Sequence, residues 1–387
     1  MNLVGIYIHV PFCRVRCPYC SFNVYTRRGH LAEAYAGALI DELDARLEAL
    51  PDGAVVDTIY FGGGTPTLLA PSVLADLVDA VAARLPLSSA TEITVETEPG
   101  TTSPDVFAAL RSFATRITIG AQSFDDEALT RIGRPHDAAT ARQAFAQARA
   151  AGFTNIDLDL MFGLPGQSRA AWEADLDAAV SLGPEHLSLY NLTVEPFTTF
   201  ATALKKGRLP LPPEDDQAAM LRHALARCGE AGLEHYETSN FARAGFRSRH
   251  NQAYWTGRPW LGIGAGAHGF LPTGPWGTRW WNVRPPERWM ARIAEGALPE
   301  DGREELDREQ ALLEALMLGL RQRDGLDRSD LRDRFGADVD LRLEAAAGSL
   351  AEEGLLRIDP DCLKLTEAGV ILTDSITSTL ARSLDTM

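Results

Sequence analysis

The sequence predicts an α/β fold, in which a partial (β/α)6 TIM-like barrel is followed by a small α+β module that is winged-helix-like. Short runs rich in Ile, Val, Leu, Tyr and Phe alternate six times with longer amphipathic stretches. Strand–helix units that repeat in this way build a parallel sheet, which is either open or curled toward a barrel. Near the end of the chain the pattern changes to three helical stretches and two short β-rich runs.

The elements of the barrel follow from this alternation, and each expected strand is bounded by turn residues. Strands are expected at residues 5–10, 58–61, 92–96, 116–120, 155–161 and 186–190. Helices are expected at residues 31–50, 71–85, 104–113, 138–151 and 170–182. Ser103 followed by Pro104 is a helix start signal, because a capping hydroxyl precedes a proline at the first helical position.

Two further regions are expected after the barrel, which we assign to residues 1–213 because proline and glycine accumulate near its end. Region 214–303 opens with a helix at 217–231 and then becomes rich in Gly, Pro and Trp. Six of the seven tryptophans lie within 35 residues of this region. Their rings either fill a core or form an apolar wall for a flat ligand.

The last region, residues 304–387, is expected to be a separate acidic module. Helices are expected at 308–322, 327–335 and 341–353, followed by a hairpin through 355–365. Winged-helix modules often bind DNA, but residues 301–387 hold 11 Lys+Arg against 20 Asp+Glu, a net charge of −9. Because such a charge repels phosphate, we expect the module to cover the barrel mouth or to dock a partner.

The composition of the whole chain limits the class of protein. The chain has 387 residues, of which 45% are apolar and 23% charged, as in ordinary globular proteins. Its net charge of −16 argues against a nucleic-acid partner. No run approaches the roughly 18 apolar residues of a membrane span, and the first residues resemble a strand rather than a signal peptide. We therefore expect a cytoplasmic protein.

Five cysteines carry the strongest signal. Cys13, Cys17 and Cys20 form a C-x3-C-x2-C pattern after the first strand, whereas Cys228 and Cys362 are isolated. An odd number of cysteines without an export signal is a poor disulfide framework. Three thiolates can hold three irons of a cubane iron–sulfur cluster and leave the fourth open. Zinc is the alternative, but it needs a fourth ligand from a distant residue.

Polar residues at the ends of the expected strands form a second signal, because the carboxyl ends of parallel strands converge on one face. The glycines at 62–64 let backbone N–H groups approach a ligand carboxylate or amine. Glu96 and Asp159 can accept hydrogen bonds from ligand hydroxyl or ammonium groups, and Arg134 can pair with a carboxylate. Each residue alone is more often structural or solvated, so the prediction depends on their joint placement.

Together, these features resemble the radical S-adenosylmethionine (SAM) superfamily, and within it the coproporphyrinogen III oxidase-like branch and its HemW haem chaperones. The resemblance covers nearly the whole chain. It implies that Cys13, Cys17 and Cys20 bind a [4Fe–4S] cluster whose open iron is chelated by the methionine moiety of SAM. It also implies radical chemistry, which belongs to the cofactor. The cofactor contacts that the resemblance implies are Tyr7, Tyr19, Gly63, Gly64, Thr65, Glu96, Gln122, Arg134, Asp159 and Thr193.

Two departures from the oxidase point away from substrate oxidation. The oxidase signature continues to a fourth cysteine, where this chain has Phe22. The oxidase also carries a long extension before its cysteines, whereas only 12 residues precede Cys13 here.

A second motif, His250-Asn251-x-x-Tyr254-Trp255, fits the H-N-x-x-Y-W signature of HemW proteins, which is associated with haem handling. Haem needs an apolar surface and an axial ligand to its iron, and His250 and Tyr254 share a face if the segment is helical. The alternative is that His250 and Asn251 cap or brace the sheet while Trp255 fills core.

These observations favour a haem chaperone that binds haem, a [4Fe–4S] cluster and SAM. It would deliver haem to an acceptor such as a respiratory-chain protein, and the sequence leaves a homodimer open. The first rival is an oxygen-independent coproporphyrinogen III oxidase, which decarboxylates propionate side chains. A different radical SAM reaction is the second rival.

Overall fold

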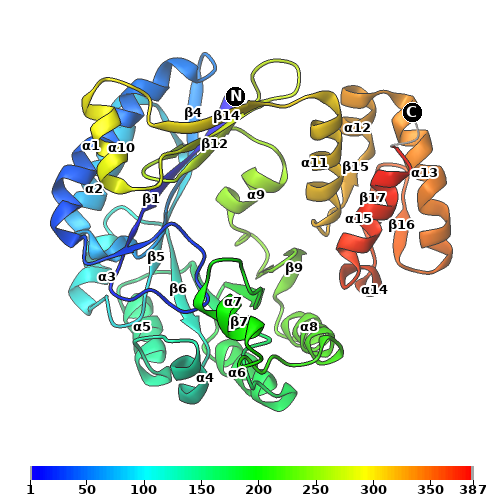
Figure 1. Cartoon of the computed structure of the whole chain (residues 1–387), viewed down its shortest axis with the longest axis horizontal. Helices are drawn as coiled ribbons and strands as arrows, with labels where there is room; N and C mark the ends of the chain where they lie inside the picture. The colour runs from blue at the N-terminus through cyan, green and yellow to red at the C-terminus, as the bar shows by residue number, and fades with distance from the viewer. Residues whose placement is uncertain (1, 385–387) are drawn as a thin grey trace.

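The central sheet confirms the predicted α/β class. In the computed structural model, which describes residues 2–384, six parallel strands lie side by side in chain order. They are β1 (Asn2–Val10), β4 (Ala54–Gly63), β5 (Leu87–Thr97), β6 (Arg116–Gln122), β7 (Ile156–Phe162) and β8 (His186–Asn191). Figure 1 shows the helices that connect these strands on the outer side of this curved sheet. Every predicted strand is present: β1, β4, β5 and β6 are two to six residues longer than predicted, β8 is one residue longer, and β7 is shifted by one residue.

The helices between these strands also match the prediction. They are α1 (Ala32–Arg46), α2 (Pro71–Arg84), α3 (Pro104–Leu110), α5 (Ala138–Ala150) and α6 (Arg169–Ser181). The Ser103 hydroxyl accepts a hydrogen bond from the Val106 amide at 3.3 Å, so the predicted cap is confirmed. Two short helices, α4 (Asp126–Arg131) and α7 (Thr199–Lys205), were not predicted, because neither is long enough to show a helical period.

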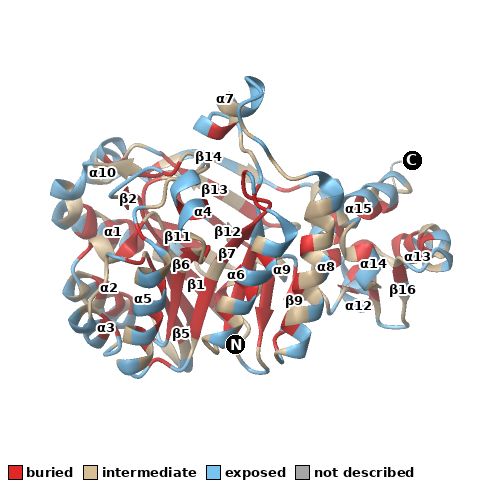
Figure 2. Cartoon of the chain, turned by 90° about the horizontal axis from the view of Figure 1, so that it is seen from below, coloured by how far each residue is buried: buried red, intermediate tan, exposed pale blue. Residues whose placement is uncertain are grey.

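The main core lies between the sheet and its outer helices. Val4, Ile6 and Ile8 of β1 are at most 1% exposed, and so are Leu39 of α1 and Leu74 of α2. Figure 2 shows this pattern along the strands, which are mostly buried, while the outer faces of the helices are exposed. In β6 and β7 apolar residues alternate with polar ones that are mostly buried, and this period of two made the strands recognisable in the sequence.

The region after the barrel extends both edges of the same sheet. Beyond β8 lie β10 (Asn240–Ala242) and β9 (Glu234–Glu237), while β11 (Trp260–Ile263) pairs in parallel with β1. Outside β11 come β12 (His268–Leu271), β13 (Thr278–Asn282) and β14 (Glu300–Glu305). The helices are α8 (Glu214–Glu230), α9 (Arg249–Trp255) and α10 (Pro286–Ala294). These strands are short, and only α8 was predicted.

The C-terminal module has the predicted helices and hairpin. Its elements are α11 (Arg308–Leu320), β15 (Leu326–Asp327), α12 (Arg328–Phe335), α13 (Ala337–Glu352), β16 (Leu356–Ile358), β17 (Cys362–Leu365), α14 (Glu367–Val370) and α15 (Thr373–Arg382). The hairpin β16–β17 is antiparallel, as expected, and α14 and α15 were not predicted. Leu316, Leu343 and Leu363 are fully buried in a core of its own. The boundaries at 213 and 303 stay predictions.

Within residues 2–384, no helix combines the length and the apolar character that crossing a membrane requires.

Candidate cluster and cofactor site

The three clustered cysteines lie on a loop that begins at the end of the first strand. Cys13 ends the short strand β2 (Phe12–Cys13), which pairs with β3 (Tyr25–Thr26), and the Cys20 amide donates to the Cys17 carbonyl at 3.1 Å. All three are free thiols. Burial raises the pKa of Cys13 to about 11, and the other two cysteines contribute to this rise. The three sulfurs are therefore near enough to repel one another as thiolates.

Two polar groups from elsewhere in the chain contact these thiols: Thr65 follows strand β4, and Arg134 follows helix α4. The Thr65 hydroxyl lies 3.7 Å from the sulfur of Cys13, and the Arg134 guanidinium lies 3.5 Å from the sulfur of Cys17. A guanidinium stabilises negative charge on a thiolate or on a cluster that thiolates hold. The loop thus presents sulfur ligands beside a permanent positive charge.

The donor set fits a cluster in which each thiolate binds a separate iron. Within residues 2–384, no three His, Cys, Asp or Glu side chains surround one position suited to a single metal ion. A cubane makes a different demand, because its irons occupy separate corners and each takes one thiolate. The raised pKa of Cys13 also means that binding iron would release its proton.

The glycine turn after β4 is tied to the cysteine loop. The Gly64 amide donates to the Val10 carbonyl, and the Thr65 amide donates to the Phe12 carbonyl, both at 2.8 Å. A Cβ on Gly64 would lie 2.6 Å from the Phe12 carbonyl oxygen, so no larger residue fits there. The Gly63 amide donates to Glu96 at 3.1 Å. All three amides therefore have protein acceptors in this structure, and the contact of this turn with a ligand stays a prediction.

Two carboxylates project from neighbouring parts of the sheet into this region. Glu96 accepts hydrogen bonds from the Tyr60 hydroxyl at 2.8 Å and from Gly63. Burial raises the pKa of Asp159 well above its usual range, and the charges of Asp157 and Glu96 raise it further. Its Oδ1 atom is buried and has no hydrogen-bond partner among residues 2–384. Because a buried oxygen of this kind normally has a donor, Asp159 fits contact with a ligand hydroxyl or ammonium group.

A buried ion network lies next to Asp159, two residues away on the same face of β7. Asp157 accepts hydrogen bonds from Arg116 at 2.8 Å and from His186 at 2.7 Å. Burial opposes ionisation, yet His186 and Arg116 hold the pKa of Asp157 below its usual range. Sequence reasoning missed Arg116 and His186, although polar residues at alternate positions of a buried strand were a usable signal.

The remaining predicted cofactor contacts are Tyr7, Arg134, Gln122, Tyr19 and Thr193. The Tyr7 hydroxyl lies 3.0 Å from Nδ1 of His9, and its ring stacks on Tyr60. Arg134 pairs with Glu98 at 3.0 Å, so its carboxylate partner here is a protein group, while its buried Nε lacks a partner among residues 2–384. Gln122 has a backbone φ of 67°. The Tyr19 ring lies 6.3 Å from the ring of Phe200. Thr193 is exposed.

The second motif lies on α9, which packs against strand β4 of the barrel. His250 is only 1% exposed. Its Nδ1 lies 2.8 Å from the Thr58 hydroxyl, and its Nε2 lies 2.8 Å from the Tyr254 hydroxyl. Burial, helped by Arg258 and Arg116, lowers the pKa of His250 to about 3, so the ring is neutral. The expected shared face of His250 and Tyr254 is confirmed.

This geometry favours the bracing alternative for His250. With both ring nitrogens hydrogen-bonded and the side chain buried, neither nitrogen can bind iron in this conformation. The backbone N–H of Asn251 donates to the Ser248 hydroxyl at 3.3 Å, as in the first turn of a capped helix.

The same helix also contacts the C-terminal module. The carbonyl of Trp255, which is half-buried, accepts a hydrogen bond from Gln322 at 3.0 Å. Nearby, the Arg323 amide donates to the Tyr236 carbonyl at 3.0 Å. The motif therefore lies between strand β4 of the barrel and the C-terminal module.

Comparisons with known proteins show which families the sequence matches. The Radical SAM superfamily profile matches residues 7–179, and the HemN C-terminal domain profile matches residues 306–372. The chain is 37% identical to "Heme chaperone HemW" of Bacillus subtilis, covering 96% of this chain and 97% of that protein. It is 38% identical to the protein of the same name from Mycobacterium tuberculosis, covering 97% and 94%.

One solved structure resembles the chain over almost its full length. Coproporphyrinogen III oxidase (HemN) from Escherichia coli superposes with a TM-score of 0.82 and 24% identity, covering 98% of this chain and 90% of that one. At this identity the likeness establishes the radical SAM fold alone.

Proposed function

The chain belongs to the HemW family of radical SAM proteins, and we propose that it is a haem chaperone that binds haem and transfers it to an acceptor protein. The observation that carries the proposal is the match to HemW relatives over nearly the whole chain. Phe22 supports it, because this residue stands where the oxidase has its fourth cysteine. Its side chain is 65% exposed and so has no place in a core.

We assign the cluster to Cys13, Cys17 and Cys20, beside Arg134. When bound, the cluster would supply the electron for the cleavage of SAM. The unpartnered Oδ1 of Asp159 supports a contact with a cofactor hydroxyl. The other assigned SAM contacts remain Tyr7, Tyr19, Gly63, Gly64, Thr65, Glu96, Gln122, Arg134 and Thr193.

The acceptor is proposed to be a haem protein such as a respiratory-chain component, and the C-terminal module is the part we assign to docking it. We also propose a cytoplasmic location. It is supported by the five cysteines, which are all free thiols, as expected in a reducing compartment. Self-association into a homodimer stays a prediction.

One paired experiment separates this proposal from its rivals. Protein reconstituted anaerobically with iron and sulfide is titrated with haemin, and a parallel sample receives reductant, SAM and coproporphyrinogen III. We expect a saturable Soret shift and no decarboxylated product. Product that is lost in Cys13→Ser and kept in the control Cys362→Ser would identify an oxidase. Release of 5′-deoxyadenosine with another substrate would identify a different radical SAM reaction.

A further inference from the structure

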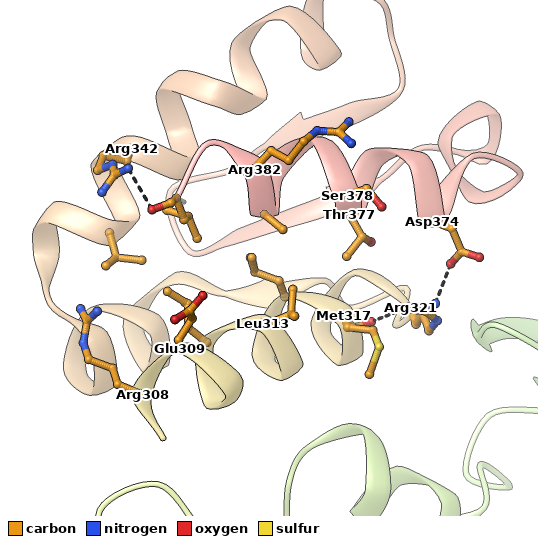
Figure 3. A pocket seen from close by; sticks show the side chains of 15 residues that line it. Arg308, Glu309, Leu313, Met317, Arg321, Arg342, Asp374, Thr377, Ser378 and Arg382 are labelled. Carbon is orange, nitrogen blue, oxygen red and sulfur yellow. Dashed lines mark hydrogen bonds and ion pairs between the residues drawn. The ribbon is translucent and has the colours of Figure 1, made fainter. Parts of the chain in front are cut away.

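The C-terminal module carries a groove that the cluster and cofactor site does not use. A cavity of about 710 Å³ lies between α11 and α15, as Figure 3 shows. Leu313 and Met317, four residues apart on α11, both line it and are 50% and 37% exposed. Pockets that hold organic ligands measure about 300–1,000 Å³ and are mostly apolar, with a few charged groups that fix orientation.

The charge of this groove is opposite to that of its module. Four of its lining residues are arginines and two are acidic, although residues 301–387 have 11 Lys+Arg against 20 Asp+Glu. Figure 3 shows Arg308 and Arg342 at one end, where Glu309 also lies, so this end holds two arginines and one carboxylate. Arg308 donates to the Phe335 carbonyl at 2.8 Å, and no carboxylate among residues 2–384 forms an ion pair with it. A positive end therefore adjoins an apolar floor.

The other end of the groove is bridged. Arg321 of α11 pairs with Asp374 of α15 at 2.6 Å, which links the two helices across the groove. A partner helix would need a groove open along its length, as in helix-in-groove recognition. A bounded compartment with one positive end instead suits a compact ligand that is apolar over its body and carries carboxylates on one edge.

Resting on the proposed function, we propose that haem binds in this groove. Leu313 and Met317 contact the macrocycle, and Arg308 and Arg342 hold the propionates. Protein ligands to haem iron are His, Cys, Met and Tyr. Of these types, only Met317 lines the groove among the described residues, so its thioether is the assigned iron ligand. His250 does not compete for this role, because both of its ring nitrogens are engaged.

The experiment titrates the full-length reconstituted protein and its groove variants with haemin. Arg308→Glu and Leu313→Asp are each expected to raise Kd about tenfold or more. The matched controls are Arg357→Glu, on strand β16, and Leu298→Asp, outside the module at a leucine that is 37% exposed. Both should stay within about twofold, since distant surface sites act independently. Arg308→Lys keeps the positive charge and should retain most of the affinity. Met317→Leu should change the visible spectrum of the bound ferrous haem.

The outcomes are distinct. If the wild type binds haemin and the groove variants bind it with unchanged Kd, the groove assignment is wrong and the proposed function stands. If the wild type binds no haemin, both are wrong. Should Leu313→Asp fail to fold, as judged by circular dichroism, the comparison of Arg308→Glu with Arg308→Lys still decides.

Discussion

Replacing His250 with alanine separates a bracing role from an iron-ligand role. The substitution removes a buried ring together with its hydrogen bonds to Thr58 and Tyr254, both 2.8 Å long. The space left behind cannot collapse easily, because Gly5 and Thr58 already pack tightly around the ring. Deleting a buried ring costs about 3–5 kcal/mol in free energy of unfolding, and the stranded Thr58 hydroxyl keeps the cost in that range.

The pH dependence of the free energy of unfolding gives a second expected value. His250 has a pKa of about 3 in the folded chain and about 6.5 when unfolded. Between these values the unfolded state binds more protons, so the wild type loses stability as pH falls below 6.5. The variant lacks this loss, so the gap between them should shrink by about 1.4 kcal/mol per pH unit.

The assay is urea unfolding at pH 7.5 and 5.5, combined with a haemin titration of the folded variant at pH 7.5. We expect the loss of stability given above and a haemin Kd within about threefold of wild type, as for a residue outside the binding site. His30→Ala, at an exposed histidine, is the control and should change neither quantity. The reasoning is refuted if His250→Ala leaves stability nearly unchanged and weakens haemin binding strongly.

Three further predictions concern the barrel. Gly64→Ala places a Cβ against two backbone carbonyls. We expect the free energy of unfolding to fall by about 1–3 kcal/mol and the reconstituted protein to hold less iron per chain. The control Gly37→Ala, whose Cβ meets nothing within 4 Å, should stabilise α1 by up to about 1 kcal/mol. Equal iron contents would contradict this. Asp157→Asn leaves buried Arg116 without its counter-charge, so thermal unfolding should show a loss of about 3–5 kcal/mol in the free energy of unfolding. An unchanged stability would show that this ion pair does not stabilise the fold. Burial raises the pKa of Glu237 to about 7, so its contribution to stability is present below pH 4.5 and is lost as pH rises through 7. Glu237→Gln should abolish this dependence of stability on pH, measured by urea unfolding between pH 5 and 8. An unchanged pH dependence would show that other groups cause it.

The sequence was a good guide wherever one local signal dominated. The barrel strands are rich in Ile, Val and Leu, in several of them at alternate positions, so they were recognisable, and the Ser103–Pro104 start signal identified α3 directly. The cysteine triplet was equally local. The convergence of Glu96 and Asp159 followed from the rule that parallel strands share one carboxyl edge.

Features set by long-range partners were not readable in the same way. The edge strands β9–β14 are short, and their pairing depends on β1 and β8, which are far away in the sequence. The role of His250 depends on Thr58, 192 residues earlier. Likewise, the Gly64 and Thr65 amides donate to the carbonyls of Val10 and Phe12, which lie more than 50 residues earlier, so no local pattern predicts these hydrogen bonds.

The haemin titration of anaerobically reconstituted protein, run beside the coproporphyrinogen III incubation, tests the central claim most directly. A haem chaperone should give a saturable Soret shift with one haem per chain and leave coproporphyrinogen III intact in the presence of SAM and reductant. Conversion of the porphyrinogen without any saturable haem binding would contradict the account.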